Sequence, residues 1–158
     1  MCIRDRTYDA RGRLESVTFD GTTRVYSYDP NGNLTQINGA TFGTYDAQDR
    51  MVTFSDATTG SWTLSYTNNG DLEYKIGSAE EYAFDYDLSS NLRSAQVTGS
   101  SAASVQYFID GMSRRVARDA TASAVTVNEG LLYDENARVV AELDGANDVL
   151  STFVYRCV

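Results

Sequence analysis

Aspartate and asparagine residues gather in two short stretches, where their side-chain oxygens are of the kind that binds calcium. The stretches are Asp29-Pro30-Asn31-Gly32-Asn33 and Asp144-Gly145-Ala146-Asn147-Asp148. An EF-hand loop needs glycine at its sixth position and a bidentate glutamate at its twelfth. Counted from Asp29, those positions hold Leu34 and Ala40. The match fails, so we interpret both stretches as turns and predict neither a metal site nor a cofactor.

Two pairs of adjacent carboxylates, Glu80-Glu81 and Asp134-Glu135, raise the possibility of acid–base catalysis. Neighbouring residues on a strand point to opposite faces, so neither pair converges by itself, and solvated charge is the better interpretation. The chain contains no histidine, which excludes a histidine-dependent triad, a histidine-ligated metal and an imidazole pH switch. We therefore predict no catalytic residue and no enzymatic activity.

Aromatic residues are dominated by tyrosine, with 11 Tyr against 6 Phe and one Trp. The tyrosines and Trp62 could stack on sugar rings, but a stacked core needs the same residues, and we favour the core. Several arginines follow turn-like segments at comparable places, and we expect them to pack on tyrosine or pair with a turn aspartate. These are Arg13, Arg50, Arg93, Arg114 and Arg138.

Charge and composition exclude several classes of partner. The net charge is −9 and the pI is about 4.4, so nucleic acid is not an expected partner. No apolar run approaches the roughly 20 residues of a membrane span. Cys2 and Cys157 lie near opposite ends, and a linear array of repeats keeps its ends apart, so we do not expect them to form a disulfide.

The stretch Tyr28-Asp29-Pro30-Asn31-Gly32-Asn33-Leu34 has the composition of a tight hairpin turn. Asp29 can bond back to the backbone, Pro30 presets φ, and Gly32 tolerates positive φ. Its pattern recurs along the chain with the anchors Tyr8, Tyr28, Tyr45, Tyr66, Tyr86, Ile109, Tyr133 and Tyr155, at a mean spacing of 21 residues. Helical repeats usually need about 33 residues or more, whereas about 20 residues suit two strands and two turns.

Between the turns the sequence alternates with period two, as in residues 62–66 and 82–86. Alternation rich in aromatic and β-branched residues predicts half-buried strands. We therefore predict an all-β fold of repeated antiparallel β-hairpins that form an extended twisted sheet or a β-solenoid. One hairpin is marginal alone, so the repeats must stabilise one another.

The fourth turn position loses its glycine along the chain, reading Gly12, Gly32, Asp49, Gly70, Ser90, Ser113 and Ala137. Aspartate tolerates positive φ moderately, and serine and alanine tolerate it poorly. We therefore expect the later turns to be wider or of another type.

The motif Tyr-Asp-x-x-Gly-Arg/Asn-Leu, complete at residues 8–14 and 28–34, resembles the YD repeat of Rhs proteins. Similar repeats occur in teneurins and in the C components of bacterial toxin complexes. The segments 109–116, 132–134, 140–145 and 153–155 resemble the last repeats before the Rhs-associated core region. The resemblance implies a large hollow β-shell, which in toxin members encloses a C-terminal toxin.

From this resemblance we expect residues 7–156 to be an array of about seven repeats, truncated at both ends, in a secreted or cell-surface bacterial protein. Residues 1–6 resemble a translated sequencing adaptor, so we expect a non-native leader there. The expected partners are neighbouring repeats of the parent chain and an encapsulated toxin. The alternative is an extracellular adhesion module that binds carbohydrate or protein.

Overall fold

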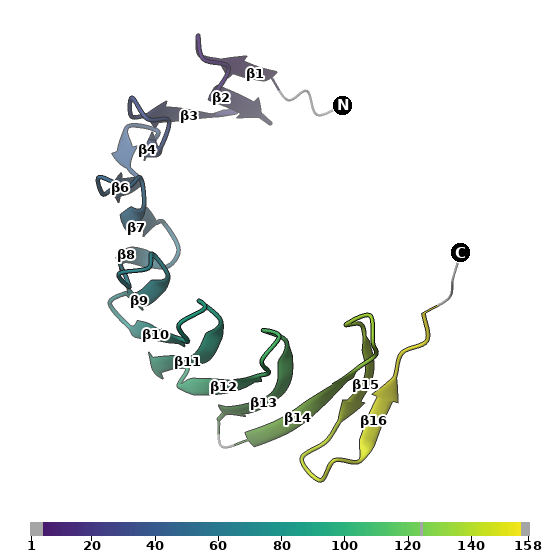
Figure 1. Cartoon of the computed structure of the whole chain (residues 1–158). Helices are drawn as coiled ribbons and strands as arrows, with labels where there is room; N and C mark the ends of the chain where they lie inside the picture. The colour runs from purple at the N-terminus through teal and green to yellow at the C-terminus, as the bar shows by residue number, and fades with distance from the viewer. Residues whose placement is uncertain (1–4, 124, 156–158) are drawn as a thin grey trace. The chain divides into compact units, whose positions relative to one another are not determined.

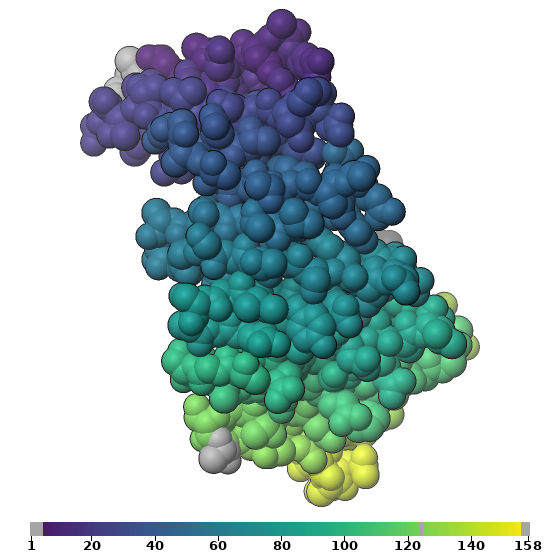
Figure 2. All heavy atoms as spheres, turned by 90° about the vertical axis from the view of Figure 1, so that its left-hand side faces the viewer, coloured from purple at the N-terminus to yellow at the C-terminus, as the bar shows by residue number. Residues whose placement is uncertain are grey.

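The computed structural model describes residues 5–123 and 125–155, which form strands and turns without a helix (Figure 1). This confirms the predicted all-β class. Contacts divide the chain into two compact units, with the boundary between Leu64 and Ser65. Within each unit, strands that follow one another in sequence lie next to one another, as the colour bands of Figure 2 show. The pairing is antiparallel throughout, as predicted for repeated hairpins.

The first unit contains a five-stranded sheet in the order β1-β2-β3-β4-β5, followed by the antiparallel strands β6, β7 and β8. The bounds are β1 (Asp5–Tyr8), β2 (Leu14–Phe19), β3 (Thr22–Tyr28), β4 (Leu34–Ile37), β5 (Ala40–Thr41), β6 (Gly43–Tyr45), β7 (Met51–Asp56) and β8 (Gly60–Tyr66). The amide of Phe42 donates to the carbonyl of Thr35, and the amide of Ser55 donates to that of Phe42, each at 2.7 Å. Phe42 thus links the two groups of strands.

The second unit continues with eight strands that pair in strict sequence order. The bounds are β9 (Leu72–Ile76), β10 (Glu80–Tyr86), β11 (Leu92–Gly99), β12 (Ala103–Ile109), β13 (Arg115–Ala122), β14 (Val125–Tyr133), β15 (Val139–Leu143) and β16 (Val149–Thr152). Strictly sequential pairing keeps contacts local, which is what repeats of about 20 residues require.

The tyrosine-led turns leave one fixed irregularity in the ladder of strand hydrogen bonds. The register shifts at the residue before the turn, for example between Ser27 and Tyr28 and between Asp85 and Tyr86. The residue at the fourth turn position has positive φ, 77° at Gly12 and 103° at Gly32. This is a type I turn followed by a bulge residue in the left-handed region, the usual three-residue hairpin connection.

The later turns have the same geometry, so the expectation that they would be wider or of another type was wrong. The fourth position has φ of 61° at Asp49, 61° at Ser90, 59° at Ser113 and 59° at Ala137. The two backbone hydrogen bonds that close the turn also recur in each of them. The register of the flanking strands and the side-chain bonds described below therefore hold these residues in a conformation that they disfavour alone.

Two connections lie at the strand ends away from the tyrosine-led turns, and their residues indicate tight turns that do not belong to the repeat motif. Asp20-Gly21 joins β2 to β3, and Asn38-Gly39 joins β4 to β5. All four residues have positive φ, between 48° and 77°. Asp-Gly and Asn-Gly are the dipeptides that type I′ two-residue hairpins favour, so this part of the fold was visible in the sequence.

Burial is shallow, because the strands form single sheets and the described residues include no helix to cover a face. Among the described residues only Gly43, Trp62, at 7% exposure, and Ala141, at 5%, are buried. The apolar side chains therefore remain half-exposed, and stability must come largely from strand pairing and from contacts between neighbouring turns.

Several predictions concern residues at the ends of the chain. Cys2, Cys157 and residues 1–4 of the expected leader lie outside the described residues. Asp5 and Arg6, the last two leader residues, belong to β1 and pair with Thr18 and Val17 of β2. The origin of residues 1–6 and the boundaries of the array stay predictions.

Candidate functional site: the turn ladder

The most regular feature of both units is a series of five-residue turns, here called the turn ladder. In each turn the first residue's amide donates to the fifth residue's carbonyl, and the fourth residue's amide donates to the first residue's carbonyl. The turns are Asp9–Arg13, Asp29–Asn33 and Asp46–Arg50 in the first unit, and Thr67–Asp71, Asp87–Asn91, Asp110–Arg114 and Asp134–Arg138 in the second. The positions are numbered one to five below.

The aspartate at position one stabilises its own turn with both carboxylate oxygens. In the turn that starts at Asp46, Oδ1 accepts the amides of Gln48 at 2.8 Å and Arg50 at 3.0 Å. Oδ2 accepts Nε of Arg50 at 2.8 Å. The side-chain and backbone bonds from Arg50 lower the pKa of Asp46 below 3.8. Bonding to the charged form is the general cause of such a shift.

Three other turns repeat this arrangement and confirm the expected pairing of arginine with the turn aspartate. The pairs are Arg13–Asp9, Arg114–Asp110 and Arg138–Asp134, each at 2.7 Å. The pKa of each of these aspartates is lowered, with the backbone amide of the arginine as the largest cause. Arg93 does not belong to this set, because Asn91 occupies position five of its turn and bonds Asp87 Oδ2 at 2.9 Å.

The arginine at position five also covers the tyrosine that precedes the next turn. The guanidinium carbon of Arg13 lies 4.6 Å from the ring centre of Tyr28, and that of Arg114 lies 4.8 Å from Tyr133. Arg138 lies equally far from the ring of Tyr155. These distances suit a cation–π contact, which confirms the expected packing of arginine on tyrosine.

Four of the anchor tyrosines reach back to the preceding turn. The hydroxyl of Tyr28 donates to the carbonyl of Leu14 at 2.8 Å, and that of Tyr45 to Leu34 at 3.0 Å. In the second unit, Tyr133 donates to Arg115 at 2.6 Å and Tyr155 to Val139 at 2.9 Å. In every case the acceptor directly follows position five, so one tyrosine joins two consecutive repeats.

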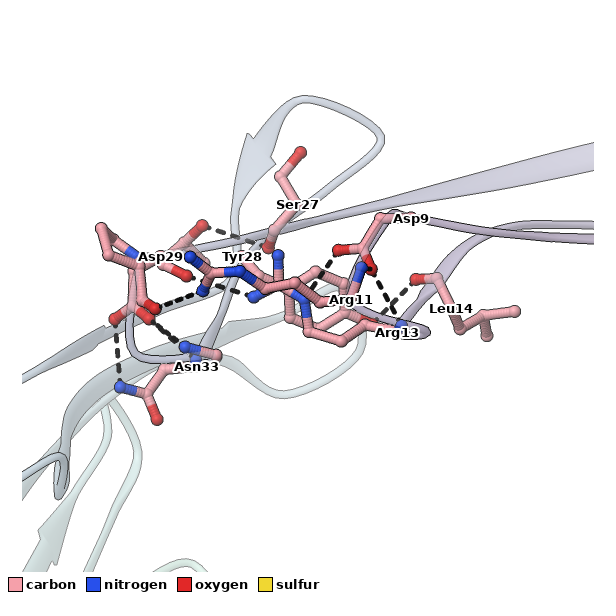
Figure 3. A network of polar contacts seen from close by, with 11 residues as sticks. Asp9, Arg11, Arg13, Leu14, Ser27, Tyr28, Asp29 and Asn33 are labelled. Atoms are coloured by element: carbon pink, nitrogen blue, oxygen red, sulfur yellow. Dashed lines mark hydrogen bonds and ion pairs between the residues drawn. The ribbon is translucent and has the colours of Figure 1, made fainter.

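Figure 3 shows the contacts within and between the first two turns. Arg13 bonds its own Asp9 and reaches the carbonyl of Asp29 at 3.2 Å, while Arg11 donates to the carbonyl of Pro30 at 2.6 Å. The motif is therefore a unit of local folding and also a connector between repeats. The sequence predicted the first role, but the backbone acceptor of the tyrosine hydroxyl carries no side-chain signal that sequence reasoning can detect.

The turn that starts at Thr67 has the same backbone hydrogen bonds as the others, but its carboxylate stands at position five instead of position one. The Thr67 hydroxyl accepts the amide of Asp71 at 3.1 Å, in place of a carboxylate. The carboxylate has moved to position five, where Asp71 lies. The geometry of the turn therefore needs an acceptor at position one but not a charge.

The two calcium-like stretches are both turns. The Oδ1 atom of Asp29 accepts the amides of Gly32 and Asn33, each at 2.8 Å, and Oδ2 accepts the side chain of Asn33 at 3.0 Å. Asp144 holds the amides of Ala146 and Asp148 in the same way, at 2.9 Å each. This last turn joins β15 to β16, at the end of β15 away from the turn ladder. It falls outside the predicted repeat, in which every anchor but Ile109 is tyrosine, because Leu143 stands in the anchor place.

The acidic pairs do not form a catalytic carboxylate dyad. Glu80 is half-buried and accepts the hydroxyl of Tyr82 at 2.8 Å, whereas Glu81 is exposed. The bond from Tyr82 lowers the pKa of Glu80, which is the opposite of what a general acid needs. Asp134 is engaged with Arg138 in its turn. Within residues 5–123 and 125–155, no group of three or more potential metal ligands gathers.

Trp62 lies inside the first unit rather than on its surface. Its ring stacks on Phe54 with the ring centres 6.2 Å apart and the planes 12° from parallel. Its indole nitrogen donates to the hydroxyl of Thr59 at 3.0 Å. With only 7% exposed, Trp62 is a core residue and not a platform for a sugar ring.

The second unit carries an open apolar concavity of about 480 Å³ on its sheet. Strands β10 to β14 line it with small and branched side chains, among them Val97, Val105, Ala120 and Val127. Val125 and Val127 are 64% and 40% exposed. The concavity therefore leaves apolar side chains of the sheet accessible.

Comparison with known proteins identifies a family and solved structures with a similar fold. A family model described as Teneurin YD-shell matches residues 3–155. The fold is similar to a chain in the crystal structure of TcdB2-TccC3-TEV, with a TM-score of 0.71 and 14% sequence identity. That similarity covers 91% of this chain and 9% of the other chain. No curated protein sequence matches.

Proposed function

The chain belongs to the teneurin YD-shell family, and from this premise we propose that it is a non-catalytic wall segment of a hollow β-shell that encloses a C-terminal toxin. The single observation that carries the proposal is the turn ladder, in which tyrosine and position five join each turn to the next. Because each turn offers the next one similar contacts, such a ladder adds repeat after repeat to a sheet, and it needs no active site. The aspartates and arginines of the ladder bond one another, and its tyrosines bond the preceding turn.

The single-layer sheet supports the enclosing role. An apolar sheet face normally packs against a second layer. In the second unit, the concavity between β10 and β14 leaves valine side chains open. A wall that faces another polypeptide provides the missing layer. The resemblance to toxin-bearing Rhs proteins makes a toxin the proposed occupant and a secreted or surface-exposed protein the proposed setting.

The test uses the complete gene product that contains this sequence. We expect electron cryo-microscopy to show residues 3–155 as part of a shell wall with additional chain inside it. Limited proteolysis should spare that enclosed chain until the shell is opened, while the same segment expressed alone should be digested rapidly. An empty shell, or an enclosed segment digested as fast as the free one, would contradict the proposal.

A carbohydrate-binding adhesion module is the alternative. Trp62 is buried, so a sugar-stacking surface would have to use other aromatics, such as Tyr8 at 56% and Tyr74 at 37% exposure. Reproducible binding on a glycan array that is lost in Tyr74→Ala and retained in Trp62→Phe would favour this alternative.

A further inference from the structure

Three pairs of successive turns, each pair within one unit, contact each other through position five of one turn and position four of the next. Asn33 Nδ2 donates to its own Asp29 at 3.0 Å and also to Asp49 of the next turn at 2.8 Å. Asn31 adds a second bond to the same Asp49 oxygen at 2.7 Å. Asp49 is the position-four residue of its turn, with φ of 61°.

The second unit contains two junctions of the same kind. Ser90, at position four, donates its hydroxyl to the position-five carboxylate of Asp71 at 3.0 Å. Asn91, at position five, donates to the hydroxyl of Ser113, at position four of the next turn, at 3.2 Å. Ser90 and Ser113 have φ of 61° and 59°. We call these three contacts the polar junctions.

Where position five is arginine, position four of the next turn has no polar side chain. Arg13 reaches past Gly32, so that a Cβ built on Gly32 would lie 3.9 Å from its Nη1, and bonds the carbonyl of Asp29. Arg114 covers Tyr133, in the repeat whose fourth position is Ala137. We call these contacts the arginine junctions. By residue type alone, Arg50 and Gly70 follow the same rule.

The conformational cost explains why the two kinds of junction need different residues. A residue other than glycine is disfavoured in the left-handed region, so glycine is the default at position four. Such strain persists only where the surroundings hold the residue. At the polar junctions the side chain at position four bonds the neighbouring turn, which offsets the strain. At an arginine junction the guanidinium contacts the tyrosine ring, and in Arg13 also the backbone of the next turn, and the glycine or alanine at position four makes no side-chain hydrogen bond.

We propose that positions five and four form a matched pair that selects which turn stacks on which. Asparagine at position five fits a neighbouring turn with aspartate or serine at position four, aspartate fits one with serine, and arginine fits one with glycine or alanine. The two kinds of junction alternate irregularly along the chain, so a repeat shifted by one place would leave mismatched pairs. The inference rests on the contacts of the turn ladder and is independent of any cargo.

A double-mutant cycle on the full chain tests the pairing at Asp49. The cycle combines Asp49→Gly with the joint change Asn31→Ala/Asn33→Ala, and denaturant unfolding measures the unfolding equilibrium constant. Asp49→Gly changes the unfolding constant by one factor when both asparagines are present and by another when both are absent. We expect the first factor to favour unfolding about five-fold more than the second. The Asn33–Asp29 bond is lost in both proteins that lack the asparagines, with or without Asp49→Gly, so its contribution cancels.

Two further variants separate pairing from general stability. Asp49→Ser, which introduces the residue type of the Asn91–Ser113 junction, should keep the coupling, and Asp49→Ala should abolish it. At an arginine junction, Arg114→Ala and Ala137→Gly should be additive, because the methyl of Ala137 has no polar partner. The side-chain amide resonances of Asn31 and Asn33 should shift in Asp49→Gly.

Additive effects of Asp49→Gly and the asparagine changes would overturn the proposal. Unchanged asparagine side-chain resonances in Asp49→Gly would do the same, and they remain measurable if one variant of the cycle fails to fold.

Discussion

At the scale of single residues, the turn aspartate is the centre of each repeat. In the turn that starts at Asp110, its carboxylate accepts hydrogen bonds from two backbone amides and from the side chain at position five. The aspartate and the position-five residue of the motif thus have a direct structural role. Position four bears the conformational strain of the turn. The two positions have different consequences for stability, and each can be changed separately.

Ala137→Gly should stabilise the protein. Ala137 has φ of 59°, and a left-handed conformation costs a residue with a Cβ about 1–2 kcal/mol. Glycine loses about 0.5–1 kcal/mol in chain entropy, so we expect a net gain of about 0.5–1 kcal/mol in the free energy of unfolding. Urea denaturation measures it. The matched control is Gly32→Ala, where φ is 103°, which should destabilise.

The turn aspartates should make the protein acid-sensitive. The pKa values of Asp9, Asp46, Asp110 and Asp134 are lowered in the folded chain, so the unfolded chain binds more protons. Their contribution is present above the ordinary pKa of 3.8 and is lost as pH falls from there through the lower folded values. We expect the melting temperature to drop below about pH 4.

Thermal melts at a series of pH values check this expectation. In Asp110→Asn the drop should be smaller, because one linked carboxylate is gone, although the variant starts from a lower melting temperature. A melting temperature that rises on acidification would contradict the sign of these pKa shifts.

At the scale of elements, tyrosine hydroxyls and position-five side chains join hairpins that follow one another within each unit. The strands themselves are short, and a hairpin of this size is marginal alone. Links between turns therefore stabilise the strand ends, where the bulge interrupts the regular strand pairing.

Tyr28→Phe should weaken the link between the first two turns without changing the ring contact with Arg13. The change removes the 2.8 Å bond to the carbonyl of Leu14, and we expect a loss of about 0.5–1.5 kcal/mol in the free energy of unfolding. Hydrogen exchange should become faster around Leu14. Tyr8→Phe is the matched control, and it should have little effect because Tyr8 is 56% exposed.

At the scale of the whole molecule, the protein is an array in which each repeat depends on its neighbours. Shallow burial in both units means that no repeat has a core of its own. Among the described residues, no helix is long and apolar enough to cross a membrane. Stability is then a property of the array, as in other repeat proteins.

Tyr66→Ala or Leu72→Ala should unfold several repeats of the second unit together. Both residues flank the same turn, at the ends of β8 and β9, so their loss removes contacts on both sides of it. Hydrogen exchange should accelerate over neighbouring hairpins. Loosening confined to one hairpin would contradict this expectation. Leu88→Ala, at a fully exposed turn position, is the control and should leave exchange unchanged.

The sequence by itself determined the all-β class, the repeat and the pairing of arginine with aspartate. These features are local, because the residues of Asp9–Arg13 or Asp110–Arg114 find each other within one turn whatever surrounds them. Period-two alternation likewise reports on single strands. The Asp-Gly and Asn-Gly connections were equally readable from the sequence, since their backbone requirement is a property of two adjacent residues.

Only the tertiary structure decided the contacts between repeats. Local propensity gave the wrong answer for Ser90, Ser113 and Ala137, because strand register and neighbouring side chains hold them in the left-handed region. It could not show that Tyr28 bonds the carbonyl of Leu14, or that Asn33 bonds Asp49. It favoured a core position for Trp62 over a sugar platform, and the burial of Trp62 against Phe54 confirms this. These interactions join residues 8 to 16 positions apart, and only strand pairing fixes which of them meet.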